Sequence, residues 1–236
     1  MSRTMNNIAA IPEWPQNRAV ATALRSTLAA VGLDKPEEET TTVVLLSGGI
    51  DSVAVLANVL EHTAHRVHAH HVELANRDER VQAENDAVAE VVDYCWRRYR
   101  DFSFSSSGSE FRITPKGYDL IITMFHAALV CLGARRKTDF VMTGHFRTSK
   151  LRALYGQQML DSCFVNPRMR PRWLRPLDLL PDPATAKVDI YRSVPPELAE
   201  LGWSCRHPVA VEGGFEACGA CYACRNLEAA RVALSR

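Results

Sequence analysis

Two glycines and three polar side chains form a short run whose residue types could bind the phosphates of a nucleotide. The run follows a stretch of β-branched and apolar residues at 41–46. Glycines let backbone N–H groups approach phosphate oxygens, and the first turn of a following helix adds free N–H groups and the positive end of the helix dipole. The run therefore predicts an ATP site. Its residues are Ser47, Gly48, Gly49, Ile50, Asp51 and Ser52.

The polar members of this run are the candidate catalytic residues. Ser47 and Ser52 can donate hydroxyl hydrogen bonds, and a carboxylate at Asp51 suits either a Mg²⁺ ligand or an anchor for the start of the helix. The run is not a Walker A loop, because the pattern Gly-x-x-x-x-Gly-Lys is absent. The competing interpretation is a tight strand-to-helix turn in which Asp51 is only the N-cap.

Four of the seven cysteines gather near the C-terminus. Three of them are spaced three residues apart, and the fourth precedes them by thirteen residues. Four thiolates make a closed tetrahedral site, which is typical of structural Zn²⁺, while an iron–sulfur cluster and a redox pair remain alternatives. The predicted metal ligands are Cys205, Cys218, Cys221 and Cys224. We expect Cys95, Cys131 and Cys163 to be inert core residues.

The elements that must position these residues alternate along the chain between residues 41 and 143. Alternating strands and helices predict an α/β fold, a Rossmann-like parallel sheet with helices on both faces. Strands are expected at 41–46, 67–74, 101–105 and 139–143, with a Ser/Gly loop at 105–109. Helices are expected at 17–32, 51–61, 80–99 and 119–135. The last of these carries the longest apolar stretch, is too short to span a bilayer and is predicted to be buried.

The chain divides by composition into three parts. Residues 1–40 read as an N-terminal helix and linker, and residues 41–150 as the ATP-binding α/β domain. Prolines recur in residues 151–236, which predicts short elements in a helical and loop-rich subdomain that holds the zinc site.

Composition argues for an ordinary globular protein. The chain has 236 residues, 47% of them hydrophobic, and a net charge of about +1. Near-neutral charge argues against a strongly basic surface for nucleic acid or membrane, so we expect neither as a direct partner. An odd cysteine count and the lack of a secretory signal favour a reducing compartment, and we expect a cytoplasmic protein.

The glycine loop and the cysteine cluster together resemble a known family. The segment 47–52 is similar to the PP-loop of the N-type ATP pyrophosphatases, which activate a substrate oxygen as an adenylate and release pyrophosphate. The segments 203–205 and 218–224, Trp-Ser-Cys and Cys-Gly-x-Cys-x-x-Cys, resemble the C-terminus of the QueC family of 7-cyano-7-deazaguanine synthases.

This resemblance implies an activity and a set of partners. A QueC-like enzyme adenylates a 7-carboxy-7-deazaguanine-type carboxylate and converts it with ammonia to the amide and then the nitrile, preQ0, for deazaguanine modification of tRNA or DNA. The implied cofactors are ATP and Mg²⁺ at the loop 47–52 and Zn²⁺ at the four cysteines. A small deazaguanine-type substrate and ammonia are the expected partners, and a homodimer is one allowed assembly.

Two segments depart from the family's base-binding pattern, and they keep other functions open. Residues 114–119 lack the family's Arg-Asn pair, and residues 144–150 replace its Tyr-Pro-Asp-Cys-Arg string. The alternatives are a PP-loop amide ligase for another carboxylate, a PP-loop tRNA thiolase, and a non-catalytic nucleotide-binding scaffold. Arg147 and Lys150 could neutralise phosphate charge or form a solvated basic loop. His68 and His70 are expected on one face of a strand, as polar residues near the adenine or on the surface.

Overall fold

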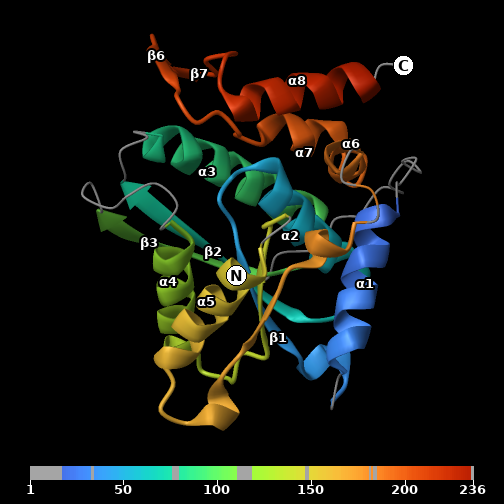
Figure 1. Cartoon of the computed structure of the whole chain (residues 1–236), viewed down its shortest axis with the longest axis vertical. Coiled ribbons are helices and arrows are strands. Elements are labelled where there is room, and N and C mark those ends of the chain that lie inside the picture. Colours follow the sequence, from blue (N-terminus) through green and yellow to red (C-terminus); the bar gives the residue numbers. More distant parts are fainter. Residues whose placement is uncertain are drawn as a thin grey trace, which may run out of the picture.

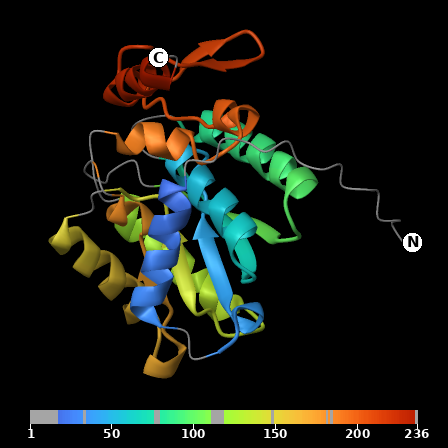
Figure 2. The same cartoon turned by 90° about the vertical axis from the view of Figure 1, so that its right-hand side faces the viewer.

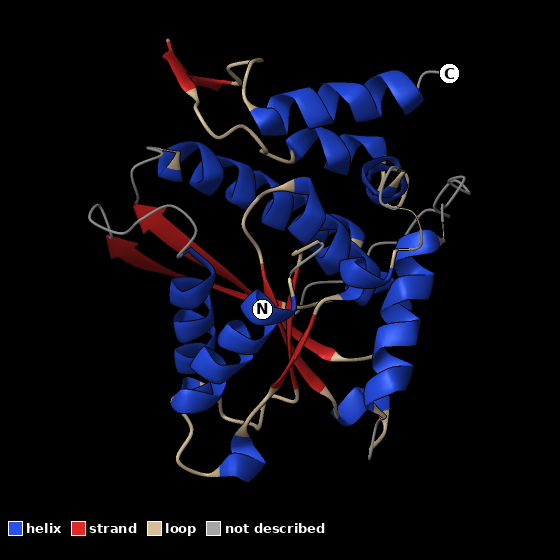
Figure 3. Ribbon diagram, in the orientation of Figure 1, coloured by secondary structure: helices blue, strands red, loops and turns tan. Residues whose placement is uncertain are grey.

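The protein is a five-stranded parallel sheet covered by helices (Figures 1 and 3). The computed structural model describes residues 18–32, 35–75, 80–110, 119–146, 149–180, 182 and 185–234. The strand order is β3-β2-β1-β4-β5, and every neighbouring pair runs parallel. The strands are β1 Thr41–Leu45, β2 Arg66–Ala75, β3 Ser103–Glu110, β4 Phe140–Thr143 and β5 Arg172–Leu174.

Eight helices connect and flank these strands within the described residues. They are α1 Ala19–Val31, α2 Ile50–His62, α3 Val81–Arg98, α4 Asp119–Gly133, α5 Lys150–Ser162, α6 Ala186–Tyr191, α7 Pro196–Leu201 and α8 Tyr222–Leu234. Short 3₁₀ turns lie at Glu37–Glu39, Pro167–Met169 and Pro176–Leu179, and a hairpin pairs β6 Val209–Val211 with β7 Gly214–Glu216.

Period-two alternation along the strands divides the core into two layers. In β1, Val44 belongs to the cluster formed with α1, α2 and α3, whereas Val43 and Leu45 pack against α4 and α5. Both faces of the central strand are therefore apolar, as expected of a parallel sheet with helices on each side. The predicted α/β fold with helices on both faces is confirmed.

The segment predicted as a Ser/Gly loop at 105–109 is a strand. β3 runs through Glu110 and pairs residue by residue with β2, from His68 opposite Ser103 to Ala75 opposite Glu110. Serines are poor strand formers by propensity, but here their hydroxyl groups pair with histidine rings on the neighbouring elements. This tertiary context overrides the local preference.

The prediction that the apolar helix is buried is correct for one side of α4 only. Met124, Ala127 and Ala128 are fully covered, but Phe125, Leu129 and Leu132 are 43%, 48% and 51% exposed. Apolar residues occur all around this helix, while the sheet covers only one side of it. No helix in the described part of the chain is long and apolar enough to cross a membrane.

Residues beyond 150 contribute to the sheet and to its main core. β5 adds the fifth strand, and Leu177, Ile190, Leu198 and Ala230 join the cluster around α2. The three-part division of the chain stays a prediction, although the sheet itself crosses residue 150. The expectation of short elements there is wrong for α5 and α8, which are 13 residues each, because both lie outside the proline-rich stretches. In Figures 1 and 2, α8 and the hairpin form the outermost layer next to α6 and α7.

Candidate functional site

The glycine loop joins the end of β1 to the start of α2. Gly48 has a φ of 75°, in the left-handed region that favours glycine. A Cβ atom there would also lie 3.2 Å from the Glu84 carbonyl oxygen and 3.2 Å from Val88 on α3. Both the backbone conformation and the close approach of α3 therefore require a glycine at this position.

The two serines hold the loop in a compact turn. The Ser47 backbone N–H donates to Ser52 Oγ over 3.1 Å, and the Ser52 hydroxyl donates to the Gly49 carbonyl over 2.9 Å. The Ser47 and Ser52 hydroxyl oxygens are 3.1 Å apart. Since the Ser52 proton is directed to Gly49, Ser47 is the donor in that pair. The predicted loop residues therefore come together as one hydrogen-bonded unit.

Gly49, and not Asp51, is the N-cap of α2. The interpretation of Asp51 as a simple N-cap is therefore wrong, because Asp51 lies within the first helical turn. Gly49 has no side chain to cap the helix, so the N–H groups of Ile50 and Asp51 and the helix dipole are available to an anion, whereas the Ser52 N–H donates to the Gly49 carbonyl over 3.0 Å. This is the arrangement that phosphate binding requires.

The Asp51 carboxylate pairs with a lysine that sequence reasoning missed. Lys187 Nζ on α6 lies 2.5 Å from Asp51 Oδ1, and both side chains are about 30% exposed. Lys187 lies 136 residues from Asp51 and follows a proline-rich stretch, so nothing in the local pattern identified it. Tertiary packing of α6 against α2 brings this cation to the loop.

A cavity of about 910 Å³ opens over the carboxyl ends of β1, β2 and β4. This is where ligands bind in open parallel sheets. The described lining includes five of the six loop residues. The sixth, Gly48, packs against α3 instead. The basic side chains of the lining are Arg80, Arg152, Lys187 and Arg206. These cations give the cavity lining positive charge, which suits an anionic ligand.

The end of β4 closes one side of the cavity. Gly144 approaches α2 so closely that a Cβ atom would collide with the Ser52 backbone nitrogen. His145 follows it, contacts Trp173 edge to face at 6.0 Å between ring centroids, and lines the cavity. Burial lowers the pKa of His145, so its imidazole is neutral near pH 7 and able to accept a proton.

The predicted basic residues after β4 have different outcomes. Arg147 lies outside the described residues. Lys150 begins α5, is exposed and is not among the described residues that line the cavity. Arg152, two residues further along α5, does line it.

The cavity lining also carries an ion-pair group formed by Arg80, Glu84 and Asp119. Arg80 Nε lies 2.9 Å from Glu84 Oε1, and Arg80 Nη2 lies 3.3 Å from Asp119 Oδ2. Burial raises the pKa of Glu84, although the positive charge of Arg80 opposes this shift. The carboxylates of Glu84 and Asp119 and the guanidinium of Arg80 offer both hydrogen-bond acceptors and donors to a polar ligand in the cavity.

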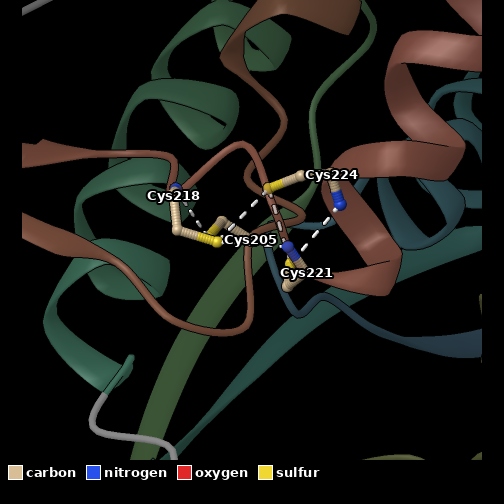
Figure 4. A group of neighbouring side chains, drawn as sticks. All are labelled: Cys205, Cys218, Cys221 and Cys224. Atoms are coloured by element: carbon tan, nitrogen blue, oxygen red, sulfur yellow. Dashed lines mark hydrogen bonds between the residues drawn. The ribbon is translucent and has the colours of Figure 1, made fainter.

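The four predicted metal ligands converge, as Figure 4 shows. All four sulfur atoms lie within 4.8 Å of one another. Three backbone N–H groups donate to sulfur atoms of the cluster. The Cys218 N–H donates to Cys205 Sγ over 3.3 Å. The Cys221 N–H donates to Cys218 Sγ and the Cys224 N–H to Cys221 Sγ, each over 3.4 Å. Such bonds stabilise thiolates, the form in which cysteine binds a metal. The donor set and its spacing fit a metal ion.

One hydrogen bond connects the cysteine site to the phosphate loop. The Trp203 backbone N–H donates to the Gly48 carbonyl over 2.8 Å, two residues before Cys205. A Cβ atom on Gly49 would lie 3.5 Å from the Trp203 carbonyl oxygen. The metal-site segment therefore lies directly against the loop.

The remaining cysteines do not line the cavity in the described part of the chain. Cys95 and Cys131 are buried, and burial raises the pKa of their thiols to about 12 and about 11. Both therefore stay protonated, as an inert core cysteine should. Cys163 is only half-buried, so its placement differs from the expected core position.

The prediction that His68 and His70 share one face of a strand is confirmed. Their rings stack with centroids 6.3 Å apart, and His70 also lines the cavity. Both rings form hydrogen bonds with Ser105 of β3, where the predicted strand ends and the predicted loop begins.

Comparison with known proteins identifies the type of fold. No protein-family model matches the chain, and no curated protein sequence matches it. Among solved structures, the chain is similar to the U34-tRNA thiolase NcsA from Methanococcus maripaludis, determined with its 4Fe-4S cluster. The TM-score is 0.51 and the identity 14%, and the match covers 92% of this chain and 71% of the thiolase. This likeness shows a shared α/β fold.

Proposed function

We propose that this chain is an ATP-dependent ligase that adenylates a small carboxylate and converts it with ammonia to an amide. In the first step the carboxylate oxygen attacks the α-phosphorus of ATP and pyrophosphate leaves. In the second step ammonia attacks the acyl carbon and AMP leaves. Following the QueC resemblance, the proposed carboxylate is a 7-carboxy-7-deazaguanine, and a second ATP-dependent round dehydrates the amide to the nitrile.

The observation that carries this proposal is the glycine loop 47–52, whose Asp51 pairs with Lys187 of α6. The uncapped start of α2 and the compact serine turn suit a pyrophosphate leaving group, and Lys187 suits the charge that develops on it. Asp51 is the residue proposed to hold Mg²⁺, which would supply further shielding of phosphate charge. His145, neutral and in the same cavity, is a candidate to take a proton from the attacking nitrogen.

The cysteine site is proposed to hold Zn²⁺ in a structural role. Four thiolates about 2.3 Å from one tetrahedral ion lie about 3.8 Å from each other. Cys218 Sγ and Cys224 Sγ are 4.0 Å apart, and Cys221 Sγ and Cys224 Sγ are 3.4 Å apart. In a 4Fe-4S cluster each thiolate binds a different iron and points outward, so the sulfur atoms stand farther apart. The spacing therefore favours a single ion.

A tRNA thiolase is the second candidate, because the similar solved structure is one. Sulfur transfer requires a reactive thiol or a cluster with an open iron. None of the cysteines in the described ranges lines the cavity, and the four clustered ones form a closed ligand set. These two observations favour the ligase over the thiolase.

The test is a mass-spectrometric assay of the purified protein with Mg-ATP, ammonium and 7-carboxy-7-deazaguanine, following the base, AMP and pyrophosphate. Formation of the amide or nitrile together with AMP supports the proposal, and the amide alone means that the second round is missing. A parallel reaction replaces the base by unmodified tRNA and ammonium by sulfide. Thiolated tRNA there, with iron and acid-labile sulfide in the protein, would overturn the ligase assignment.

A further inference from the structure

The helix α4 has the composition of a helix that is covered on all sides. Residues 120–133 contain no charged side chain. A helix that is hydrophobic all round is normally buried all round. The sheet and α5 cover one side of α4, and Phe125, Leu129 and Leu132 on the other side remain about half exposed. The described chain therefore lacks a second surface to cover this helix.

The exposed residues of α4 form a stripe that faces toward α5. They lie on one side of the helix, because they are spaced by four and three residues. The connections β3–α4–β4 and β4–α5–β5 both move toward β5, so right-handed crossovers place the two helices side by side on one face of the sheet (Figure 1). Both helices run opposite to the strands, and their right-handed winding then turns the stripe of α4 toward α5 and turns Tyr155 of α5 toward α4.

α5 extends the stripe with apolar residues of its own. Leu151, Leu154 and Tyr155 are each about half exposed and are spaced by three and four residues. They point away from the side on which Gly156 and Leu160 are buried. We call the combined set the α4–α5 apolar patch. Its members are Phe125, Leu129, Leu132, Leu151, Leu154 and Tyr155.

The area of this patch matches what one partner of a stable dimer buries. A fully exposed apolar side chain of this size presents roughly 150 Å², so six half-exposed ones present about 450 Å². A standard interface buries about 800 Å² per partner, and about 65% of a homodimer interface is apolar, which amounts to about 500 Å². Apolar patches of this extent are uncommon on proteins that stay monomeric.

The composition of the patch favours a second copy of this chain over a different protein. Interfaces between transient partners are on average no more apolar than the remaining surface, whereas homodimer interfaces are more apolar and have few charges at their centre. Arg152 is the one charged residue of the segment 151–160, and it lines the cavity. Two copies of the patch can therefore face each other without burying an unpaired charge.

The charges at the two ends of each helix fit a two-fold arrangement. Asp119 begins α4, whereas Arg135 and Arg136 follow its end. Lys150 begins α5, whereas Asp161 lies near its end. If a two-fold axis sets the helices of two copies antiparallel, each end of a helix meets the oppositely charged end of the same helix in the partner. Such a surface is complementary to itself, as a two-fold interface requires.

We propose that the α4–α5 apolar patch is the interface of a two-fold homodimer, in which α4 and α5 of one copy pack antiparallel to those of the other. The partner covers the exposed side of α4 and gives this helix the second apolar surface that its composition requires. The proposal does not depend on the reaction proposed above, because it uses neither the glycine loop nor the cysteine site.

Sedimentation equilibrium of the full-length protein over a concentration series is the first test. The parent should reach twice the chain mass of 26.3 kDa at micromolar concentration, as an interface of standard size allows. A parent that keeps the mass of one chain at every concentration would overturn the proposal.

Substitutions in the patch then locate the interface. Leu129→Glu and Leu151→Glu should each raise the dissociation constant of the dimer by about a hundredfold or more, because every dimer would bury two unpaired carboxylates. Leu151 lies in the first turn of α5, where a negative charge favours the helix, so Leu151→Glu should fold normally by circular dichroism. Val232→Glu on α8, at a comparably exposed apolar position, is the matched control and should stay dimeric. A dimer that survives both patch variants, or that is lost equally in Val232→Glu, would contradict the assigned surface.

Hydrogen exchange of the parent locates the interface without any substitution. Peptides from α4 and α5 should exchange more slowly above the dissociation constant of the dimer than below it. Peptides from α1, on the opposite face of the sheet, should exchange equally at both concentrations. Concentration-dependent protection of other elements, with α4 and α5 unchanged, would reject the α4–α5 apolar patch as the interface.

Discussion

At the scale of single residues, Asp51 and Lys187 form the charged pair on which nucleotide chemistry would depend. Asp51 Oδ1 and Lys187 Nζ are 2.5 Å apart, both side chains are about 30% exposed, and the pair links the first turn of α2 with α6. An exposed pair of this kind contributes little to stability, typically below about 1 kcal/mol. Its consequence for function should therefore be separable from its consequence for folding.

Asp51→Asn should abolish most Mg-dependent ATP turnover, by about a hundredfold or more, while the melting temperature changes little. Steady-state release of AMP and pyrophosphate measures the first effect, and thermal unfolding measures the second. Asp93→Asn is the control, because it removes the same charge from a more exposed ion pair, Asp93 with Arg97 on α3, away from the cavity. Full ATP turnover in Asp51→Asn would contradict the role assigned to this carboxylate.

Gly48→Ala should destabilise the protein and also weaken ATP binding. A left-handed backbone costs an alanine about 1–2 kcal/mol, and here the added methyl group also meets α3. Gly213→Ala is a close control, since Gly213 has a φ of 87° but no atom within 4 Å of the added Cβ and lies in the β6–β7 hairpin. Urea unfolding and calorimetric titration with ATP should show destabilisation in both variants and weaker binding only in Gly48→Ala.

At the scale of elements, the segment with the four cysteines supports the phosphate loop. Trp203 donates to Gly48, and Cys221 and Cys224 flank the first turn of α8. Loss of the metal would free this segment and remove that support. The cysteine site should thus influence ATP binding although no cysteine lines the cavity in the described ranges.

Cys218→Ser should lower both the bound metal and the melting temperature. A loss of about 3 kcal/mol would lower the melting temperature by about 6–12 °C for a protein of this size. ATP affinity should fall as well, because the Trp203 contact is loosened. Metal analysis, thermal unfolding and ATP titration check the three effects. Cys163→Ser, half-buried and outside the cluster, should leave the metal content unchanged.

The contact between β2, β3 and α4 should make stability depend on pH through His70. Its pKa is about 4 in the folded protein and about 6.5 when unfolded, so between these values only the unfolded chain binds the proton. Stability should therefore be unaffected above about pH 6.5 and fall as the pH drops toward 4, by about 3 kcal/mol in all. Urea unfolding of the parent and of His70→Gln across this range should show a smaller loss in the variant.

At the scale of the whole molecule, the C-terminal residues are part of the main core. β5 completes the sheet, α6 brings Lys187 to the cavity, and α8 contributes Ala230 to the cluster around α2. The cavity lies between the sheet and these late elements. Formation of this cavity should accordingly require the residues after 150.

A fragment ending at residue 150 should not fold cooperatively, because it lacks Trp173, Leu177 and Ile190 of the two main core clusters. The complete chain should unfold in one transition. Circular dichroism during urea unfolding compares the two. A cooperative transition in the fragment would show instead that residues 41–150 form an independent domain, as composition alone suggests.

Local patterns were sufficient to predict the α/β class, the loop 47–52 and the convergence of the four cysteines. Strand formation by apolar runs, the loop conformation that glycines allow and the convergence of closely spaced cysteines each depend on a few neighbouring residues. These features can therefore be predicted from the sequence. The extension of β3 beyond residue 105, predicted as a loop, depends on partners in β2 and is not encoded locally. The exposed apolar side of α4 has a similar cause. Apolar residues occur all around this helix, so their periodicity does not specify which side of it packs against the sheet.

The sequence by itself was enough to predict the compact glycine loop, the convergence of the four cysteines and the parallel architecture, because each rests on short-range chemistry and spacing. Only the tertiary structure decided that Lys187 meets Asp51, that Gly49 rather than Asp51 begins α2, and that Ser105 bonds to both His68 and His70. These contacts link residues far apart in the chain. Their formation depends on the packing of whole elements, whose relative positions no local pattern encodes.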